Sequence, residues 1–184
     1  DSMDLPGFRT VALDLPNFGR SGPVPGYSAE TANLETYADC LAAFIEALKL
    51  DRPVLVGHSL GGAVAQALVA KRPELVRALV LVDSAAPSGL VTPKERHPAI
   101  EMMRANPAVL AIALKAVVPA MTDDAWFAAL VEDAKLMAAP AWIGNAEALS
   151  RFDLRGRLSG FGKPVLVVWG RKDVIVTEAM ARET

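Results

Sequence analysis

The stretch VLVGHSLGGA at residues 54–63 decides the fold. A short β-branched apolar run stops here and a helical pattern begins, with Ser59 between Gly57 and Gly61 at the junction. A strand that turns sharply into a helix leaves little room for side chains on either side of the serine, and glycine supplies that room. The spacing is typical of a nucleophile elbow, which projects a serine hydroxyl above the end of a buried strand.

The same junction places backbone groups where they can stabilise charge. The amide N–H of Leu60 is expected at the start of a helix, where unsatisfied donors and the helix dipole favour an oxyanion. Ser59 is therefore the candidate catalytic nucleophile, and Leu60 is the candidate oxyanion-hole donor.

Apolar runs and helical patterns alternate on both sides of the elbow. We expect strands at 8–15, 53–56, 78–82 and 165–169, and helices at 34–48, at 60–72 and from about 177. Ser28 or Thr31 is expected to cap the first of these helices. Because the strands are continuous apolar runs, the pattern predicts an α/β fold with a mostly parallel sheet covered by helices on both faces.

The alternation stops at about residue 90 and resumes at about 160. Asn106-Pro107 predicts one helix start in this segment, Thr122-Asp123-Asp124 predicts a second, and Pro140 predicts a stop. We expect a helical lid whose Met and Trp residues roof an apolar pocket. The predicted divisions are a first core part at 1–89, the lid at 90–160 and a second core part at 161–184.

The composition of the chain indicates which kinds of molecule it can bind. The chain has 184 residues, 52% of them hydrophobic, and a net charge of −2, which favours one globular domain with an insertion. The sequence has no basic stripe, so we expect a small-molecule substrate and no nucleic-acid partner. It also has no apolar run of about 18 residues, so we expect no membrane span. Cys40 is the single cysteine, which we expect to be a buried small hydrophobe in a cytoplasmic protein.

Four segments, in this order, resemble the α/β-hydrolase superfamily. They are DLPNFGRS at 14–21, the elbow at 57–61, ALVLVDSAAP at 78–87 and PVLVVWGRKD at 164–173. The chain is similar to bacterial serine hydrolases with a helical lid, among them carboxylesterases, meta-cleavage carbon–carbon hydrolases, proline iminopeptidases and cofactor-free haloperoxidases. Serine at the elbow differs from the aspartate of haloalkane dehalogenases and epoxide hydrolases.

The resemblance implies a Ser-His-Asp triad that needs no metal and no organic cofactor. Asp173 is the implied acid because of its G-x-x-D context, and Asp83 is the alternative. Asn17 stands where the family has glycine and is expected to adopt the left-handed conformation. We expect cleavage of a small apolar ester or related carbonyl compound. Carbon–carbon cleavage, a haloperoxidase-type reaction and a non-catalytic binding role are the alternatives.

Neither histidine of the chain fits the family's base, which follows the acid in sequence. Adjacent side chains at a strand end point to opposite sides, so His58 is expected to point away from Ser59. His97 is expected to be a solvated lid residue, with a substrate contact or a stand-in base as the alternative.

A second element of the family, a strand ending in His-Gly that supplies another oxyanion N–H, is not found before residue 8. In the family's sheet that strand lies between the strands expected here at 8–15 and 53–56. We therefore expect these residues to be the middle of a longer hydrolase, with the base histidine beyond Thr184.

Overall fold

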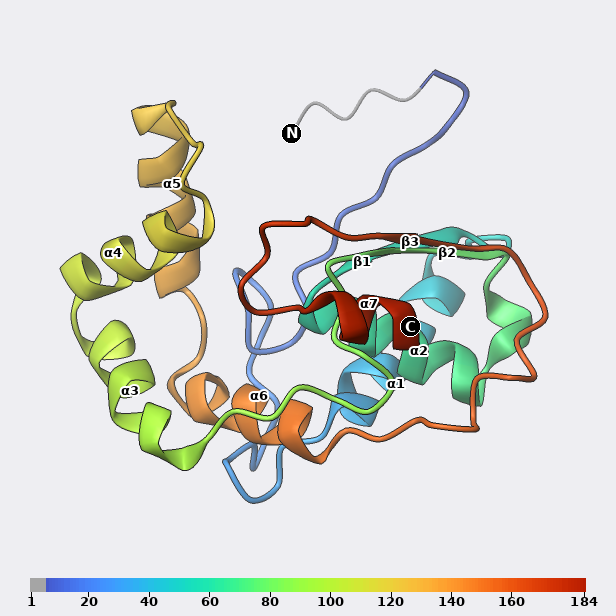
Figure 1. Ribbon diagram of the computed structural model, residues 1–184. Helices are drawn as coiled ribbons and strands as arrows, with labels where there is room; N and C mark the ends of the chain where they lie inside the picture. The colour runs from blue at the N-terminus through green and yellow to red at the C-terminus, as the bar shows by residue number, and fades with distance from the viewer. Residues whose placement is uncertain (1–5) are drawn as a thin grey trace.

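A parallel sheet forms the centre of the structure (Figure 1). This computed structural model describes residues 6–184. The strands lie in the order β1–β2–β3 and are β1 Val54–His58, β2 Ala78–Val82 and β3 Val165–Val168. Val80 of β2 lies opposite Val56 of β1 on one side and Leu166 of β3 on the other. The predicted parallel sheet of an α/β fold is confirmed.

Helices make up most of the regular structure outside the sheet. They are α1 Leu34–Ala47, α2 Leu60–Lys71, α3 His97–Ala105, α4 Pro107–Val117, α5 Asp124–Lys135, α6 Ala139–Arg151 and α7 Glu178–Glu183, with 3-10 turns at Pro73–Leu75 and Lys94–Arg96. Within residues 6–184, no helix combines the length and the apolar character needed to cross a bilayer.

Helix α1 begins later than either predicted cap. Asn33 is its N-cap, and the Asn33 side-chain oxygen accepts a hydrogen bond of 2.8 Å from the Glu35 N–H. The predicted caps were wrong because Ser28 and Thr31 form a separate turn, in which the Ser28 N–H donates to Thr31 Oγ1 at 2.9 Å. In a helix cap and in a turn of this kind, a short polar side chain accepts a hydrogen bond from a backbone N–H. The sequence pattern therefore does not distinguish the cap from the turn.

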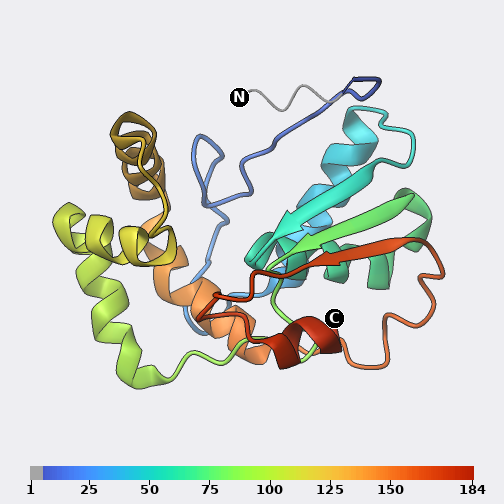
Figure 2. The same cartoon turned by 45° about the horizontal axis from the view of Figure 1, so that its top comes forward.

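The sheet has two unlike faces within the described residues. Leu79 and Leu81 are buried on the face where α2 contacts β1 and β2, and α1 packs against α2 (Figure 2). On the other face, Val56 is 64% exposed and Leu166 is 56% exposed. The sequence predicts helices on both faces, and within residues 6–184 the structure has them on the face of Leu79 and Leu81.

The predicted strand at 8–15 is wrong. In the structure these residues run as non-regular chain outside the sheet, with Phe8 63% exposed and Val11 43% exposed. An apolar extended run becomes a strand only where a neighbouring backbone completes its hydrogen bonds. Within residues 6–184, β1 forms an edge of the sheet, and no ladder extends from it to this run. Asn17, just beyond, has the predicted left-handed conformation, with φ 71°.

Helices α3 to α6 lie between β2 and β3 in the sequence and stand to one side of the sheet in Figure 1. Two predicted starts are confirmed: Asn106 Oδ1 accepts from the Ala108 N–H at 3.0 Å, and Asp123 Oδ1 accepts from the Trp126 N–H at 2.9 Å. The predicted stop at Pro140 is wrong. Pro140 lies in the first turn of α6, where a helix does not need the missing N–H. The lid boundaries at 90 and 160 remain predictions.

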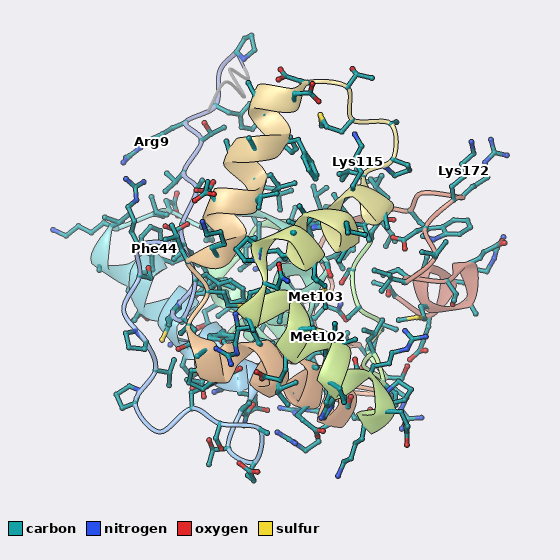
Figure 3. All side chains as sticks on the ribbon, turned by 90° about the vertical axis from the view of Figure 1, so that its left-hand side faces the viewer. Arg9, Phe44, Met102, Met103, Lys115 and Lys172 are labelled. Carbon is teal, nitrogen blue, oxygen red and sulfur yellow. The ribbon has the colours of Figure 1, made fainter. Side chains whose placement is uncertain are left out.

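The outer lid helices, α3 to α5, carry exposed apolar side chains. Figure 3 views this side of the molecule and labels Met102 and Met103 on α3 and Lys115 on α4. Lys115 Nζ lies 5.3 Å from the ring centroid of Phe127 on α5, a cation–π contact between the two helices. Met102 is 57% exposed and Trp126 is 50% exposed, so the outer lid presents apolar surface to its surroundings.

Helix α6 is joined to the core through a buried polar cluster, the Asn145 anchor, formed by Asn17, Tyr27, Tyr37 and Asn145. Asn145 Oδ1 accepts hydrogen bonds from the Tyr27 hydroxyl at 2.7 Å and from the Tyr37 hydroxyl at 2.9 Å. Asn17 Nδ2 donates to the Tyr37 hydroxyl at 2.8 Å. Burial raises the pKa of both Tyr27 and Tyr37, which keeps the phenols protonated as donors. The cluster therefore ties α6 to α1 and to the loop at 16–24.

Replacing Asn145 with leucine is expected to lower the free energy of unfolding by about 2–4 kcal/mol, because two buried hydroxyls lose their shared acceptor. Urea denaturation of the full-length protein measures this loss. Asn106→Leu, which removes an exposed cap on α4, is the control and is expected to cost about 1 kcal/mol. Equal losses in the two variants would contradict a special role for the anchor.

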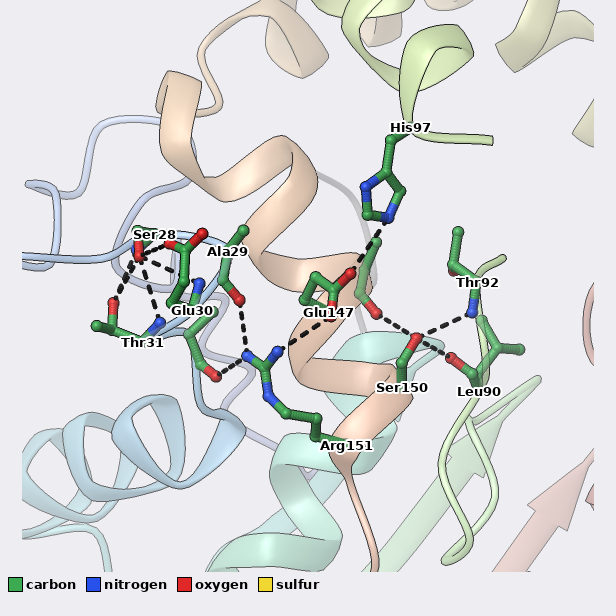
Figure 4. Close-up of polar contacts among 12 residues, drawn as sticks. Ser28, Ala29, Glu30, Thr31, Leu90, Thr92, His97, Glu147, Ser150 and Arg151 are labelled. Carbon is green, nitrogen blue, oxygen red and sulfur yellow. Dashed lines mark hydrogen bonds and ion pairs between the residues drawn. The ribbon is translucent and has the colours of Figure 1, made fainter. Parts of the chain in front are cut away.

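A second polar group joins α6 to α3 and to the chain before α1 (Figure 4). Arg151 Nη2 donates to the carbonyl oxygens of Ala29 at 2.9 Å and Ala32 at 2.8 Å, while Nη1 lies 3.1 Å from a carboxylate oxygen of Glu147. The other oxygen of Glu147 lies 3.4 Å from His97 Nε2. The prediction of a solvated His97 is therefore wrong in part, because the imidazole packs between α3 and α6 with its side chain 21% exposed.

Cys40 lies on the solvent side of α1 and is exposed. The prediction of a buried thiol is therefore wrong. The inward face of α1 is formed by Leu34, Tyr37, Ala38 and Ile45, and position 40 falls outside that stripe.

Candidate active site

Ser59 lies at the sharp turn between β1 and α2, at the carboxyl end of its strand. It is the N-cap of α2 and has φ 51° and ψ −119°, a conformation that residues with a side chain rarely adopt. Strain of this kind persists only where the surroundings hold it, and it is concentrated at functional sites. The backbone thus has the geometry predicted for a nucleophile elbow.

Two glycines make the turn possible, and one of them differs from the predicted pair. A Cβ on Gly57 would lie 2.6 Å from the carbonyl oxygen of Gly61, and a Cβ on Gly62 would collide with Ser84. A Cβ on Gly61 would meet open space. The expectation that Gly61 makes room with its missing side chain is wrong, because it is the Gly61 backbone that approaches Gly57.

Hydrogen bonds hold the backbone of Ser59 on both sides. Its N–H donates to the Val82 carbonyl of β2 at 3.1 Å. Its carbonyl oxygen accepts from Gly62 at 3.0 Å and from Ala63 and Ala85, each at 3.3 Å. Leu60 is the first residue of α2, and the first amides of a helix have no intrahelical acceptor. The Leu60 N–H therefore belongs to the group of donors at this helix end.

Two aspartates follow the neighbouring strands at the same edge of the sheet. Asp83 comes directly after β2, and its Oδ1 accepts from the Gly170 N–H at 2.7 Å. Asp173 comes five residues after the end of β3, and its Oδ1 accepts from the N–H groups of Ile175 at 2.7 Å and Val176 at 2.9 Å. Parallel strands have their carboxyl ends at the same end of the sheet. Both carboxylates therefore lie at the end of the sheet where Ser59 lies.

In both aspartates Oδ2 has no hydrogen-bond partner among the described residues. The turn that carries Asp173 is held in shape by the Trp169 indole N–H, which donates to the Val176 carbonyl at 2.8 Å. Helix α7, just beyond, is capped by Thr177, so Asp173 caps a turn and not a helix. Each carboxylate therefore keeps one oxygen for a further donor.

His58 is exposed and precedes Ser59 on β1. It pairs in register with Val82, whereas Gly57 pairs with Leu81, so His58 lies on the sheet face opposite α2. His97 contacts Glu147 of α6. No group of three or more His, Cys, Asp or Glu residues within 6–184 has an arrangement that could hold a metal ion.

Gln66 belongs to none of the motifs that predict the site. It lies on α2 and is 1% exposed, and its amide nitrogen donates to Ser84 Oγ at 2.9 Å and to the Ala85 carbonyl at 2.8 Å. The signal was present: a single amide side chain interrupts the apolar run from Ala63 to Val69. A buried polar side chain requires partners, so this interruption marks a contact that the helix makes.

Comparisons with known proteins identify the family of this chain. Residues 3–184 match the family described as the alpha/beta hydrolase family. An AB hydrolase superfamily protein of Bacillus subtilis, YisY, is 32% identical over 193 residues, which cover 96% of this chain and 68% of that protein.

Two solved structures extend the comparison. A thermophilic esterase from Thermogutta terrifontis has a TM-score of 0.64 and 27% identity over 92% of this chain and 64% of its own. The enol-lactonase from Burkholderia xenovorans shares the fold, with a TM-score of 0.74 and 23% identity over 92% of this chain and 65% of its own. The chain spans about two thirds of the length of these relatives. Because the family model matches residues 3–184, and the parallel sheet and the strand–turn–helix at Ser59 are consistent with it, the chain belongs to the alpha/beta hydrolase family.

Proposed function

We propose that the protein is a serine hydrolase that cleaves a small apolar ester or a related carbonyl compound. The observation that carries this proposal is the strained Ser59 at the β1–α2 turn, with φ 51° and ψ −119°. A residue that only connected a strand to a helix would not require this conformation. The esterase relative supports an ester substrate, and the exposed apolar side chains of the lid support an apolar one.

In the proposed reaction, Ser59 Oγ attacks the substrate carbonyl carbon and loses its proton to a histidine base. The Leu60 N–H and a second donor stabilise the oxyanion that forms. Collapse of this intermediate expels the alcohol, which takes the proton from the histidine. Water then attacks the acyl-enzyme by the same route, releasing the acid and restoring Ser59. Neither His58 nor His97, the two histidines of the sequence, is assigned the role of this base.

Asp173 is the proposed acid of the triad. Two backbone N–H groups donate to its Oδ1, which fixes the orientation of the carboxyl group. Oδ2 then accepts the N–H of the base and stabilises the imidazolium that forms during attack. Asp83 is the alternative acid, because its Oδ1 accepts from the Gly170 N–H and its Oδ2 is likewise left for a further donor. The choice of Asp173 therefore rests on its G-x-x-D context in the sequence.

A fluorophosphonate probe applied to the full-length protein tests the proposal. We expect covalent labelling at about pH 7–9, where a histidine base is neutral, and phosphonylation of Ser59 in the peptide map. Turnover of p-nitrophenyl esters of graded acyl length then measures the preference for an apolar substrate. Labelling at another serine, or none in this pH range, would refute the assignment of Ser59.

A further inference from the structure

Gln66 joins the helix that follows the elbow to the loop that follows β2. Its side chain is 1% exposed, and Nε2 donates to Ser84 Oγ and to the carbonyl oxygen of Ala85. Ser84 is also buried, at 3% exposed. The amide therefore holds the segment 84–85 against α2 from inside the core, where competing water is excluded.

The same two loop residues contact the elbow. The Ala85 N–H donates to the Ser59 carbonyl oxygen at 3.3 Å. Ser84 lies so close to Gly62 that no side chain fits between them. Gln66 thus acts on the loop from one side, and the loop acts on the carbonyl of Ser59 from the other.

We infer that Gln66 is a positioning residue for Ser59, which it holds in its strained conformation through Ser84 and Ala85. This inference rests on the proposed role of Ser59 as nucleophile. Gly62 and Ala63 tie the Ser59 carbonyl to α2, and Ala85 ties it to the loop after β2. A loose Ala85 contact therefore lets the turn at Ser59 shift relative to that loop. Gln66 lies inside the core and acts through the loop, and its loss therefore changes the reactivity of Ser59 and leaves the recognition of substrate intact.

Gln66→Met is the variant that separates this role from simple packing. Methionine is unbranched and of similar length, but it cannot donate to Ser84 or to Ala85. Ser84 Oγ already donates to the Ala85 carbonyl at 2.9 Å, so that acceptor keeps a partner. Gln66 Oε1 has no hydrogen-bond partner among the described residues, and the substitution removes it. We expect the urea midpoint of Gln66→Met to fall less than that of a cavity-forming variant.

Val69→Ala supplies the matched control. Val69 lies on the same helix, one turn further from the elbow, and is 3% exposed. Its truncation leaves a cavity in the same layer of the core and removes no hydrogen bond to the loop. We expect Val69→Ala to lower the urea midpoint more than Gln66→Met does and to leave the chemistry of Ser59 unchanged.

The first measurement is inactivation of the full-length protein by a fluorophosphonate, resolved into a maximal rate and a half-saturating concentration. In Gln66→Met the maximal rate is expected to fall about tenfold, with the half-saturating concentration unchanged, because the nucleophile is misplaced and the binding surface is not. In Val69→Ala both parameters should match the parent protein. An unchanged rate in Gln66→Met, or an equal fall in both variants, overturns the inference.

The second measurement does not depend on catalysis. Hydrogen–deuterium exchange at the Ala85 amide reports its bond to Ser59, and we expect faster exchange there in Gln66→Met and not in Val69→Ala. Equal protection of Ala85 in the parent and in Gln66→Met refutes the proposed contact path. If the parent protein is not labelled at Ser59, the proposed function fails by itself, while the exchange data still decide whether Gln66 holds the loop.

Discussion

Ser59→Ala is expected to reduce kcat for an activated ester by about 10⁵-fold to 10⁶-fold, the loss seen when a nucleophile is removed from a working triad. The free energy of unfolding should stay within about 0.5 kcal/mol of the parent, because Ser59 is only partly buried and its backbone hydrogen bonds remain. Ester turnover and urea denaturation of the full-length protein measure the two quantities. Fluorophosphonate labelling should disappear with the activity.

Residual turnover distinguishes the functional alternatives. A variant that keeps most of its esterase activity would show that Ser59 does not form the acyl-enzyme and would favour a non-catalytic role for the elbow. If the parent protein leaves esters untouched but cleaves a dienoate ring-fission product, the nucleophile would stand and the substrate class would change to carbon–carbon cleavage. Substrate choice depends on the lid and pocket, so fold membership does not decide between these reactions.

Asp173→Asn is expected to lower kcat by about 10⁴-fold, because an amide in place of the carboxylate holds the base in the wrong tautomer and does not stabilise its charged form. The amide oxygen can still accept from the N–H groups of Ile175 and Val176, so the turn keeps its shape. The steady-state rate on the best ester of the panel is the measurement. Unchanged unfolding by urea would show that the loss is chemical.

Asp83→Asn is the matched control at the same edge of the sheet. Its amide oxygen can replace Oδ1 as the acceptor of the Gly170 N–H, and the distance there is 2.7 Å. We expect a loss in kcat of less than about tenfold, since this carboxylate is assigned a structural contact. The opposite result, a large loss in Asp83→Asn and a small one in Asp173→Asn, would transfer the role of acid to Asp83.

The central part of the fold could be predicted because its signals are local. The strand at 78–82 is an uninterrupted apolar run, and the structure has β2 at Ala78–Val82. Asn106, Asp123 and Thr177 each cap a helix where the sequence places a cap. The turn at Ser59 was predicted because a strand that turns this sharply into a helix has no room for a side chain at position 57, so the motif carries a glycine there.

The errors have two causes, a missing partner strand and local signals that allow two interpretations. The run at 8–15 has the composition of a strand, but strand formation requires a partner ladder, and composition does not supply one. Pro140 was interpreted as a stop, yet it starts α6, because proline suits both the end of one helix and the first turn of the next. Cys40 falls outside the buried stripe of α1, a distinction that hydrophobicity alone does not make.

For the candidate site, the sequence identified residues and the structure added their supports. Ser59, Leu60 and the two aspartates follow from motif and order. Gln66 did not, because its role depends on Ser84 and Ala85, which lie 18 and 19 residues away along the chain. The contacts of Gln66 with Ser84 and Ala85 form because β2 pairs with β1, which brings the loop after β2 beside α2.

The attachment of the lid bears on how such a protein can diverge. Helix α6 is tied to the core by the Asn145 anchor and by Arg151, while α4 packs mainly on its neighbours α3 and α5. Substitutions in α4 and α5 therefore disturb few of the contacts that shape the turn at Ser59. Under the proposed function, mutations in these helices alter which molecules are accepted and leave the proposed reactive centre unchanged. Evolution can in this way explore new substrates without first rebuilding the chemistry.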